Sequence, residues 1–224
     1  MFEELNTLWR SSTIKPSFEL VHVVLALFIF KENKEGIGRY RLQKELLLGS
    51  GTTKSLIIKL NETLNFITVL IDENLKKGHV LTNSGLRFVD KVKKRVPLLK
   101  AGDSSILKDI IIKSEAKFSY FCLVRDAIDR ITNGIDQRDA AIKIGGMGAT
   151  CLLYNGKDLI FPSHSLSQND KGQIKVKDNI FNYINSVIQN SDSQLKENDV
   201  FIIGLGENPE TARLAALNAA LTIL

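Results

Sequence analysis

The sequence has few of the features that mark secreted, metal-binding or membrane proteins. It contains only two cysteines among 224 residues, Cys122 and Cys151, and they lack a CxxC spacing. This argues against structural zinc and is typical of a reduced, cytoplasmic protein. The longest apolar run, Leu20–Phe30, contains a histidine and is shorter than the roughly 20 residues that span a bilayer. No basic segment opens the chain, so we expect no secretory signal and no membrane partner.

A recognisable catalytic set is also missing. The three histidines, His22, His79 and His164, stand apart, without the spacing of a metal site or the companions of a catalytic triad. We therefore expect no metal, no cofactor and no enzymatic activity. An enzyme of unknown reaction in the C-terminal half remains the alternative.

What is present is an uneven distribution of charge. The formal net charge is +5. Residues 1–100 contain 17 Lys and Arg against 10 Asp and Glu, whereas residues 101–224 contain 13 against 15. The basic excess therefore lies in the N-terminal part, which favours a polyanionic partner there, although a merely soluble surface would also fit so modest an excess.

The N-terminal part predicts three helices. An apolar helix is expected over residues 18–30, with Ser17 as its N-cap. A second helix, whose apolar face includes Leu42 and Leu46, ends at the turn Gly49-Ser50-Gly51. A third helix is expected over residues 53–64, with apolar residues at i, i+4 and i+8. A short helix, a glycine turn and a helix with a polar, basic outer face indicate a helix-turn-helix.

The pattern then changes to that of a β-hairpin. Residues 66–71 are β-branched and aromatic, residues 72–78 are polar and charged, and residues 79–82 predict the returning strand. A helix over residues 86–95 follows and ends before Pro97. A hairpin directly after the second helix of a helix-turn-helix is a wing.

Three short motifs lie in order along this part: Gly38-Arg39-Tyr40-Arg41-Leu42 with Lys44-Glu45-Leu46, Gly51-Thr52-Thr53-Lys54-Ser55-Leu56 with Lys59-Leu60, and Leu81-Thr82-Asn83-Ser84-Gly85. In this order and spacing they resemble prokaryotic winged-helix transcription factors. The first two are similar to the helix-turn-helix of central glycolytic and multiple-antibiotic-resistance type regulators. The third is similar to the LT-x-x-G element that ends the wing in many such repressors.

This resemblance implies double-stranded DNA as the partner. The residues implied on the major-groove helix are Thr52, Thr53, Lys54, Ser55 and Lys59. Those implied near phosphates at the start of the supporting helix are Arg39, Tyr40 and Arg41, and those at the wing tip are Lys76 and Lys77. Cationic side chains neutralise phosphates, while short polar groups on the inserted helix read base edges. Solvated helix faces, and packing for the tyrosine, are the competing interpretations.

The C-terminal half predicts a second α+β domain with a mixed sheet. We divide the chain into a winged helix over residues 1–97, a connector over 98–116 and a ligand-sensing or dimerising domain over 117–224. The expected strands are 118–125, 149–154 and 199–204, and the expected helices are 135–144, 178–189 and 210–224. Asn155-Gly156 predicts a hairpin turn, and Asn208 with Pro209 predicts the start of the last helix.

Two further motifs of this half, Gln137-Arg138-Asp139-Ala140-Ala141 with Gly148-Ala149-Thr150, and Gly204-Leu205-Gly206-Glu207-Asn208-Pro209, resemble an uncharacterised domain found behind winged helices in archaeal proteins. Gly204-x-Gly206 lacks the third glycine of a dinucleotide loop and is followed by acidic residues, so turn geometry is favoured over nucleotide binding. The candidate ligand-binding residues are Arg125, Arg138, Asp139, Gly146, Gly148 and Gly206. Because Arg125 and Arg138 are each followed directly by an aspartate, structural ion pairs are the competing interpretation.

Together these observations predict a DNA-binding transcriptional regulator. Its C-terminal domain is expected to bind a small-molecule effector or to form a homodimer, because one recognition helix contacts too few base pairs for useful specificity. A protein-docking adaptor is the other alternative, since winged helices also serve as docking modules.

Overall fold

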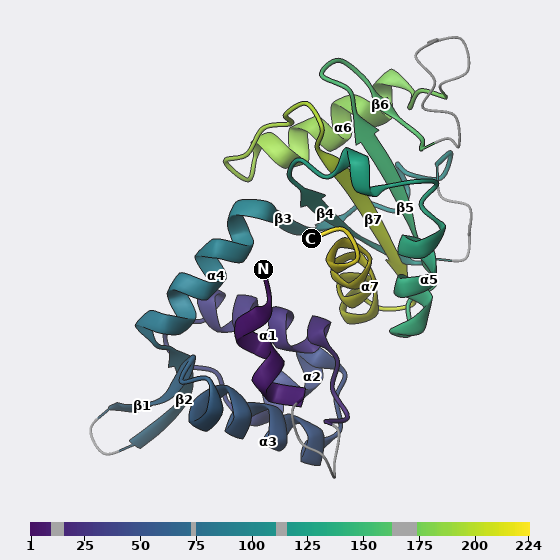
Figure 1. Ribbon diagram of the computed structural model, residues 1–224. Coiled ribbons are helices and arrows are strands. Elements are labelled where there is room, and N and C mark those ends of the chain that lie inside the picture. The colour runs from purple at the N-terminus through teal and green to yellow at the C-terminus, as the bar shows by residue number, and fades with distance from the viewer. Residues whose placement is uncertain (10–15, 73–74, 111–115, 163–173) are drawn as a thin grey trace. The chain divides into compact units, whose positions relative to one another are not determined.

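The computed structural model describes residues 1–9, 16–72, 75–110, 116–162 and 174–224. The chain divides into two compact units, Met1–Val92 and Lys93–Leu224. Each unit combines helices with antiparallel strands, so the predicted α+β class is confirmed (Figure 1). None of the helices in these ranges has the length and apolar character needed to cross a membrane.

The first unit is a group of helices followed by a two-stranded hairpin. Its elements are the 3₁₀-helix η1 (Glu3–Trp9), α1 (Leu20–Glu32), α2 (Arg39–Leu46), α3 (Ser50–Ile58) with the π-helical turn η2 (Lys59–Thr63), β1 (Ile67–Asp72), β2 (Leu75–Leu81) and α4 (Asn83–Arg95). Helix α4 continues into the second unit.

Helix α1 forms the core of the first unit. Every residue from Val21 to Phe30 is buried, which explains why the helix is apolar on all sides rather than amphipathic. The predicted cap at Ser17 is wrong, because the N-cap is Glu19, whose backbone N–H donates to Nδ1 of His22 at 2.9 Å. Ser17 instead shares a hydrogen bond with the hydroxyl of Thr52, 2.8 Å away.

Two boundaries in the first unit differ from the prediction. Helix α3 begins at Ser50 rather than at residue 53, so the glycine turn is shorter and Gly51 lies in the first helical turn. Leu47 makes this shorter turn possible by adopting a left-handed conformation with φ of 53°. The returning strand begins earlier than expected, at Leu75 rather than residue 79, so that Lys76 and Lys77 lie in β2 and not in the hairpin tip.

Two glycines allow close approach of neighbouring backbones in this unit. A Cβ atom on Gly78 would lie 2.6 Å from the carbonyl carbon of Ile37, where residues 37 and 79 form an antiparallel bridge. A Cβ atom on Gly85 would lie 2.1 Å from the carbonyl oxygen of Phe66. The N–H of Gly85 also donates to the hydroxyl of Thr82 at 3.2 Å, as in a helix N-cap. The LT-x-x-G motif is therefore a packing and capping element.

The second unit is built on a five-stranded sheet. Its elements are β3 (Leu98–Gly102), β4 (Phe118–Val124), the 3₁₀-helix η3 (Ile128–Arg130), α5 (Ile135–Lys143), β5 (Gly148–Tyr154), β6 (Leu159–Ile160), α6 (Asp178–Gln189), β7 (Val200–Gly206) and α7 (Pro209–Leu221). The strand order is β3-β4-β7-β5-β6. Strand β3 lies within the range that we expected as a connector.

The sheet is antiparallel throughout, so the prediction of a mixed sheet is wrong. A continuous apolar run such as that of β7 is typical of strands buried on both faces, as in parallel sheets. Here β7 is the central strand and all seven of its residues are buried. Phe201, Ile203 and Leu205 face the core that contains α6, whereas Gly204 and Gly206 face α7. The apolar run thus reflects helices on both faces.

The glycines of β7 are required by the packing of α7. A Cβ atom on Gly204 would lie 2.2 Å from the backbone nitrogen of Ala216, and one on Gly206 would lie 2.5 Å from that of Ala212. Both glycines therefore lie in the strand and not in a turn. The start of α7 is as predicted, with the side chain of Asn208 accepting a hydrogen bond from the N–H of Thr211 at 2.8 Å.

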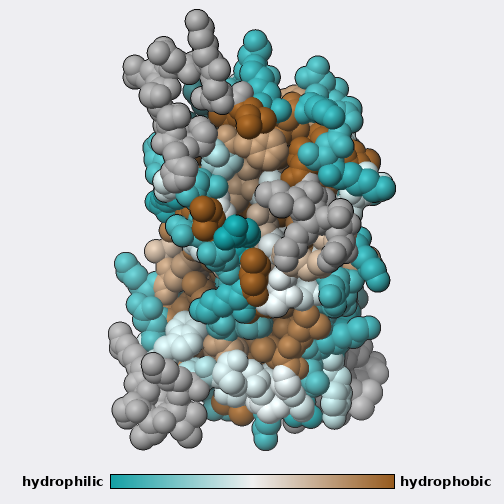
Figure 2. Space-filling view, turned by 90° about the vertical axis from the view of Figure 1, so that its right-hand side faces the viewer, coloured by the Kyte–Doolittle hydropathy of each residue, from teal (hydrophilic) through white to brown (hydrophobic). Residues whose placement is uncertain are grey.

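Exposed apolar side chains are scattered over the surface. On the face drawn in Figure 2, hydrophobic residues reach the surface in several separate groups among hydrophilic ones. Apolar side chains that are dispersed in this way are normal on soluble proteins and do not by themselves indicate an interface.

We predict that Gly204→Ala destabilises the second unit by about 1–3 kcal/mol, because the new methyl group overlaps backbone atoms of α7 that cannot rotate away. Urea unfolding followed by circular dichroism measures the loss. Gly51→Ala is the control, since no atom lies within 4 Å of a Cβ at this helical position, and it should leave stability unchanged or raise it by about 0.5–1 kcal/mol. A Gly204→Ala protein as stable as the wild type would contradict the close contact.

Candidate nucleic-acid interface

Helix α3 has one buried and one outward face. Its buried residues, together with Leu60 of the following turn, recur at helical spacing and are Thr53, Leu56, Ile57 and Leu60. On the opposite face Ser50, Gly51, Lys54 and Ile58 are exposed. The side chain of Lys54 forms no hydrogen bond or ion pair with any described residue. The outward face is thus short, polar at its start and positively charged at its middle.

Two of the predicted DNA contacts, Thr53 of α3 and Lys59 at the start of η2, form hydrogen bonds within the protein. Thr53 is fully buried, and its hydroxyl donates to the carbonyl oxygen of Gly49 at 3.0 Å. The ammonium group of Lys59 donates to the carbonyl oxygen of Leu8 at 2.9 Å, which ties the helix to η1. The hydroxyl of Thr52 is engaged with Ser17, and Ser55 is half-buried.

The predicted residues of α2 lie together at its first turn. Tyr40 is 76% exposed, so it does not pack in the core. The guanidinium of Arg39 lies over the Tyr40 ring, 5.1 Å from the ring centre, which is a cation–π distance. Arg41 is exposed, with its Nε 3.8 Å from a carboxylate oxygen of Glu45. Contacts this long between exposed groups restrain a side chain little.

The hairpin is the third element of the candidate interface, beside the outward face of α3 and the start of α2. Lys76 and Lys77 are residues of β2, but their side chains lie outside the described part of the structure. Ile37, just before α2, forms the antiparallel bridge to His79. The start of α2 and the hairpin are therefore held side by side by backbone hydrogen bonds of 3.0 and 3.1 Å.

Sequence reasoning missed two exposed residues beside these. Ile58 is 41% exposed on the outward face of α3, and Lys44 is exposed on α2. The sequence analysis gave neither residue a role at the interface. The signal that could have found Ile58 is its helical spacing, since it follows Lys54 by four residues and Gly51 by seven.

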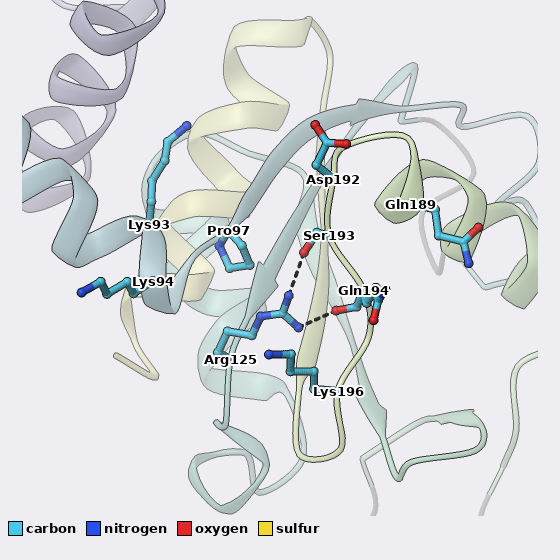
Figure 3. A pocket seen from close by; sticks show the side chains of 9 residues that line it. All are labelled: Lys93, Lys94, Pro97, Arg125, Gln189, Asp192, Ser193, Gln194 and Lys196. Atoms are coloured by element: carbon cyan, nitrogen blue, oxygen red, sulfur yellow. Dashed lines mark hydrogen bonds between the residues drawn. The ribbon is translucent and has the colours of Figure 1, made fainter.

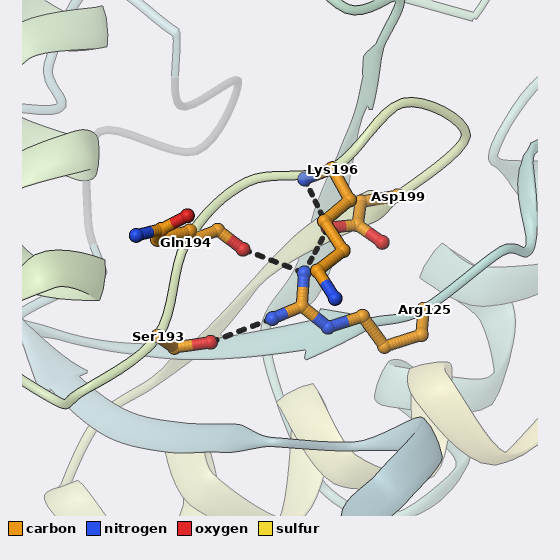
Figure 4. A network of polar contacts seen from close by, with 5 residues as sticks. All are labelled: Arg125, Ser193, Gln194, Lys196 and Asp199. Carbon is orange, nitrogen blue, oxygen red and sulfur yellow. Dashed lines mark hydrogen bonds and ion pairs between the residues drawn. The ribbon is translucent and has the colours of Figure 1, made fainter.

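In the second unit, Arg125 is part of a buried polar network (Figure 4). Its guanidinium donates to the carboxylate of Asp199, to the carbonyl oxygen of Gln194 at 2.6 Å and to the hydroxyl of Ser193 at 2.7 Å. The N–H of Lys196 donates to the same carboxylate at 2.8 Å. The side chain of Asp199 is 1% exposed and that of Arg125 is 17% exposed. The network fastens the segment after α6 to the end of β4.

The remaining ligand-binding candidates lie elsewhere. Arg138 forms an ion pair with its neighbour Asp139 at 2.8 Å. A Cβ atom on Gly148 would lie 3.6 Å from the side chain of Arg138. Gly148 pairs with Leu205 near the end of β7, whereas Val124, just before Arg125, pairs with Val200 at its start. Five residues of strand separate these points, or about 17 Å. Arg125 and Arg138 therefore do not share a pocket.

The two remaining glycine candidates also serve packing. A Cβ atom on Gly146 would lie 2.5 Å from the Cβ of Ala215. Gly206, as described above, meets α7 in the same way. Neither glycine borders a cradle that is open to a ligand.

The nucleophilic and metal-binding groups of the described residues are sparse. Cys122 and Cys151 are buried and unpaired, and burial raises the pKa of both thiols, that of Cys151 to about 12. Neither thiol is ionised at neutral pH. Burial lowers the pKa of His22 and of His79. Within the described ranges no three His, Cys, Asp or Glu side chains are grouped to hold a metal ion; His164 lies outside them.

Comparisons with known proteins agree with this two-part description. Residues 115–223 match a domain of unknown function (DUF4443). The chain is also similar to the hypothetical protein PH0730 of the archaeon Pyrococcus horikoshii OT3, with 22% identity and a TM-score of 0.64 over 92% of this chain and 93% of that one. At this identity the likeness shows the fold alone. No curated protein matches the chain.

We predict that Asp199→Asn destabilises the protein by about 2–3 kcal/mol, because it leaves the guanidinium of Arg125 largely buried without its counterion. This is below the roughly 3–5 kcal/mol of a fully buried pair, since Arg125 retains some exposure. Asp139→Asn is the matched control: its partner Arg138 is half-exposed, so the loss should stay below about 0.5 kcal/mol. Equal effects of the two substitutions in urea unfolding would contradict the structural role of the network.

Proposed function

We propose that the first unit is a winged helix-turn-helix domain that binds double-stranded DNA, and that the protein is a transcriptional regulator. The observation that carries this proposal is the outward face of α3, where Lys54 is exposed and unpaired among described residues. A short helix precedes α3 and a hairpin follows it, in the order of a helix-turn-helix with a wing. The first unit, residues 1–92, contains 13 Lys and Arg against 10 Asp and Glu, and this modest basic excess supports the same partner.

In this proposal α3 enters the major groove. Lys54 contacts a phosphate or a guanine edge, and Ile58 contacts the methyl group of a thymine. Ser50 and Gly51 bring the first backbone N–H groups of α3 close to a phosphate, where the helix dipole also favours negative charge. Thr53 and Lys59 support the helix from behind and do not contact DNA.

The residues of α2 and the hairpin position the domain on the DNA backbone. The half-buried Arg39 and the exposed Tyr40 and Arg41 lie at the start of α2, from which their hydroxyl and guanidinium groups bind phosphates. Lys76 and Lys77 follow the hairpin turn and are proposed to contact the backbone beside the groove. These contacts carry affinity but little sequence information.

The second unit is proposed to hold the regulatory role. Because a single recognition helix contacts few base pairs, we infer that the protein binds DNA as a homodimer.

The test is fluorescence-anisotropy binding of the full chain to a pool of genomic duplex fragments at two salt concentrations. We predict that Lys54→Ala weakens binding by about tenfold and lowers the slope of log affinity against log salt by about 0.9, the value for one phosphate contact. Lys108→Ala, an exposed lysine of the second unit, should change neither quantity.

Lys59→Ala distinguishes a lysine that stabilises the fold from Lys54, which is proposed to contact DNA. It should lower the free energy of unfolding by about 1 kcal/mol through loss of the hydrogen bond to Leu8, and leave the salt slope unchanged. Salt-independent binding, or a Lys54→Ala protein with wild-type affinity, would contradict the proposed interface.

A further inference from the structure

A pocket of about 760 Å³ opens in the second unit around the polar network of Arg125 (Figure 3). The last turn of α4 contributes Lys93 and Lys94, and the segment after α6 contributes Ser193 and Lys196 across from them. Four cationic side chains thus line this pocket, and the only carboxylate among its lining residues is that of Asp192. The lining is markedly basic, whereas the second unit as a whole, residues 93–224, is nearly balanced, with 17 Lys and Arg against 15 Asp and Glu.

The walls of the pocket belong to one rigid framework. The N–H of Arg125 donates to the carbonyl oxygen of Arg95 at 2.8 Å, which fixes the end of α4 to the end of β4. Strand β3 then pairs with β4 from Leu98 onward. On the other side, Arg125 holds Ser193 and Gln194 by hydrogen bonds. The pocket is therefore formed before any ligand arrives, which lowers the entropic cost of binding.

The charges of the pocket are incompletely balanced. Asp199 lies behind Arg125 and neutralises it, and Asp192 is the one carboxylate at the rim. The ammonium groups of Lys94 and Lys196 have no hydrogen-bond or ion-pair partner in the described part of the chain, and Figure 3 shows Lys196 beside Arg125. Like charges gathered around a concave surface repel one another and attract anions.

Arg125 also keeps capacity for a ligand. A guanidinium has five N–H donors, and three hydrogen bonds to protein atoms are formed by this one. Ser193 offers a hydroxyl, and Gln189 and Gln194 add amides to the lining. Lysines supply point charges for a phosphate, while hydroxyl and amide groups suit the polar remainder of a sugar or a base.

We propose that this pocket binds a small molecule that carries a phosphate group, such as a sugar phosphate or a mononucleotide. Its volume falls within the range of about 300–1,000 Å³ that ligand pockets occupy. The binding itself stands independently, whereas the role of the ligand as an effector rests on the DNA-binding function proposed above.

The test is isothermal titration calorimetry of the full chain with adenosine 5′-monophosphate, ribose 5-phosphate and inorganic pyrophosphate at low salt. Adenosine and ribose are the phosphate-free controls. We expect at least one phosphorylated probe to bind at least tenfold more tightly than its phosphate-free counterpart. We also expect the Lys94→Gln/Lys196→Gln double variant to weaken that binding by at least tenfold.

Lys108→Gln is the matched control variant, because Lys108 is exposed and lies away from the pocket. Its neighbour Asp109 pairs with Lys177 at the start of α6, whereas the pocket lies at the other end of that helix. It should bind the probes as the wild type does. Circular dichroism of each variant checks that the fold is retained. No binding of any of the three phosphorylated probes, or binding that the double variant leaves unchanged, overturns the proposal.

Binding to duplex DNA, measured on the same variants, distinguishes the pocket proposal from the DNA-binding proposal. The double variant should retain wild-type affinity for DNA in the absence of small molecules. A loss of DNA affinity in this variant, without phosphate-ester binding by the wild type, would assign these lysines to the DNA backbone and overturn the effector pocket. Phosphate-ester binding without any DNA binding would sustain the pocket and contradict the function proposed for the first unit.

Discussion

Burial of α1 is the constraint on which the first unit depends. Its residues Val21–Phe30 are all buried, and a large apolar side chain contributes roughly 1.5–3 kcal/mol when it is fully buried. Such a helix has no polar face to offer, so neighbouring elements must cover it from every side. Helix α2 and strand β2 contact it directly. The polar faces of these covering elements are consequently the surface that remains for a partner.

The order of most elements could be predicted from the sequence, because it follows from periodicity and turn chemistry, whereas η1 and β3 were not predicted. The helix Asp178–Gln189 and the capped start of α7 at Asn208 are cases where local signals suffice. The start of α3 was misplaced because Gly51 favours a turn locally, whereas the left-handed Leu47 had already reversed the chain. Thr53 lies three residues before Leu56 and seven before Leu60, so helical periodicity places it on the buried face, although the resemblance implied it at the DNA.

Contacts between segments that are distant in the chain could not be predicted from the sequence. Nothing near Lys59 indicates that Leu8 takes its ammonium group, and nothing near Asp199 indicates that Arg125 is its partner, 74 positions earlier. The same holds for Gly204 and Gly206, where a glycine pair that resembles half of a phosphate loop is explained by the close approach of α7. The basic pocket unites residues from α4, β4 and the segment after α6, and therefore required the fold.

The central claim is that the outward face of α3 contacts DNA, and amide chemical-shift mapping tests it most directly. A ¹⁵N-labelled chain titrated with operator-enriched duplex DNA should show its largest shifts at Ser50, Gly51, Lys54 and Ile58, with smaller ones at the start of α2. The buried Thr53 should change less than Lys54, its neighbour in sequence. Shifts confined to the second unit, or an unchanged spectrum at low salt, would contradict the account.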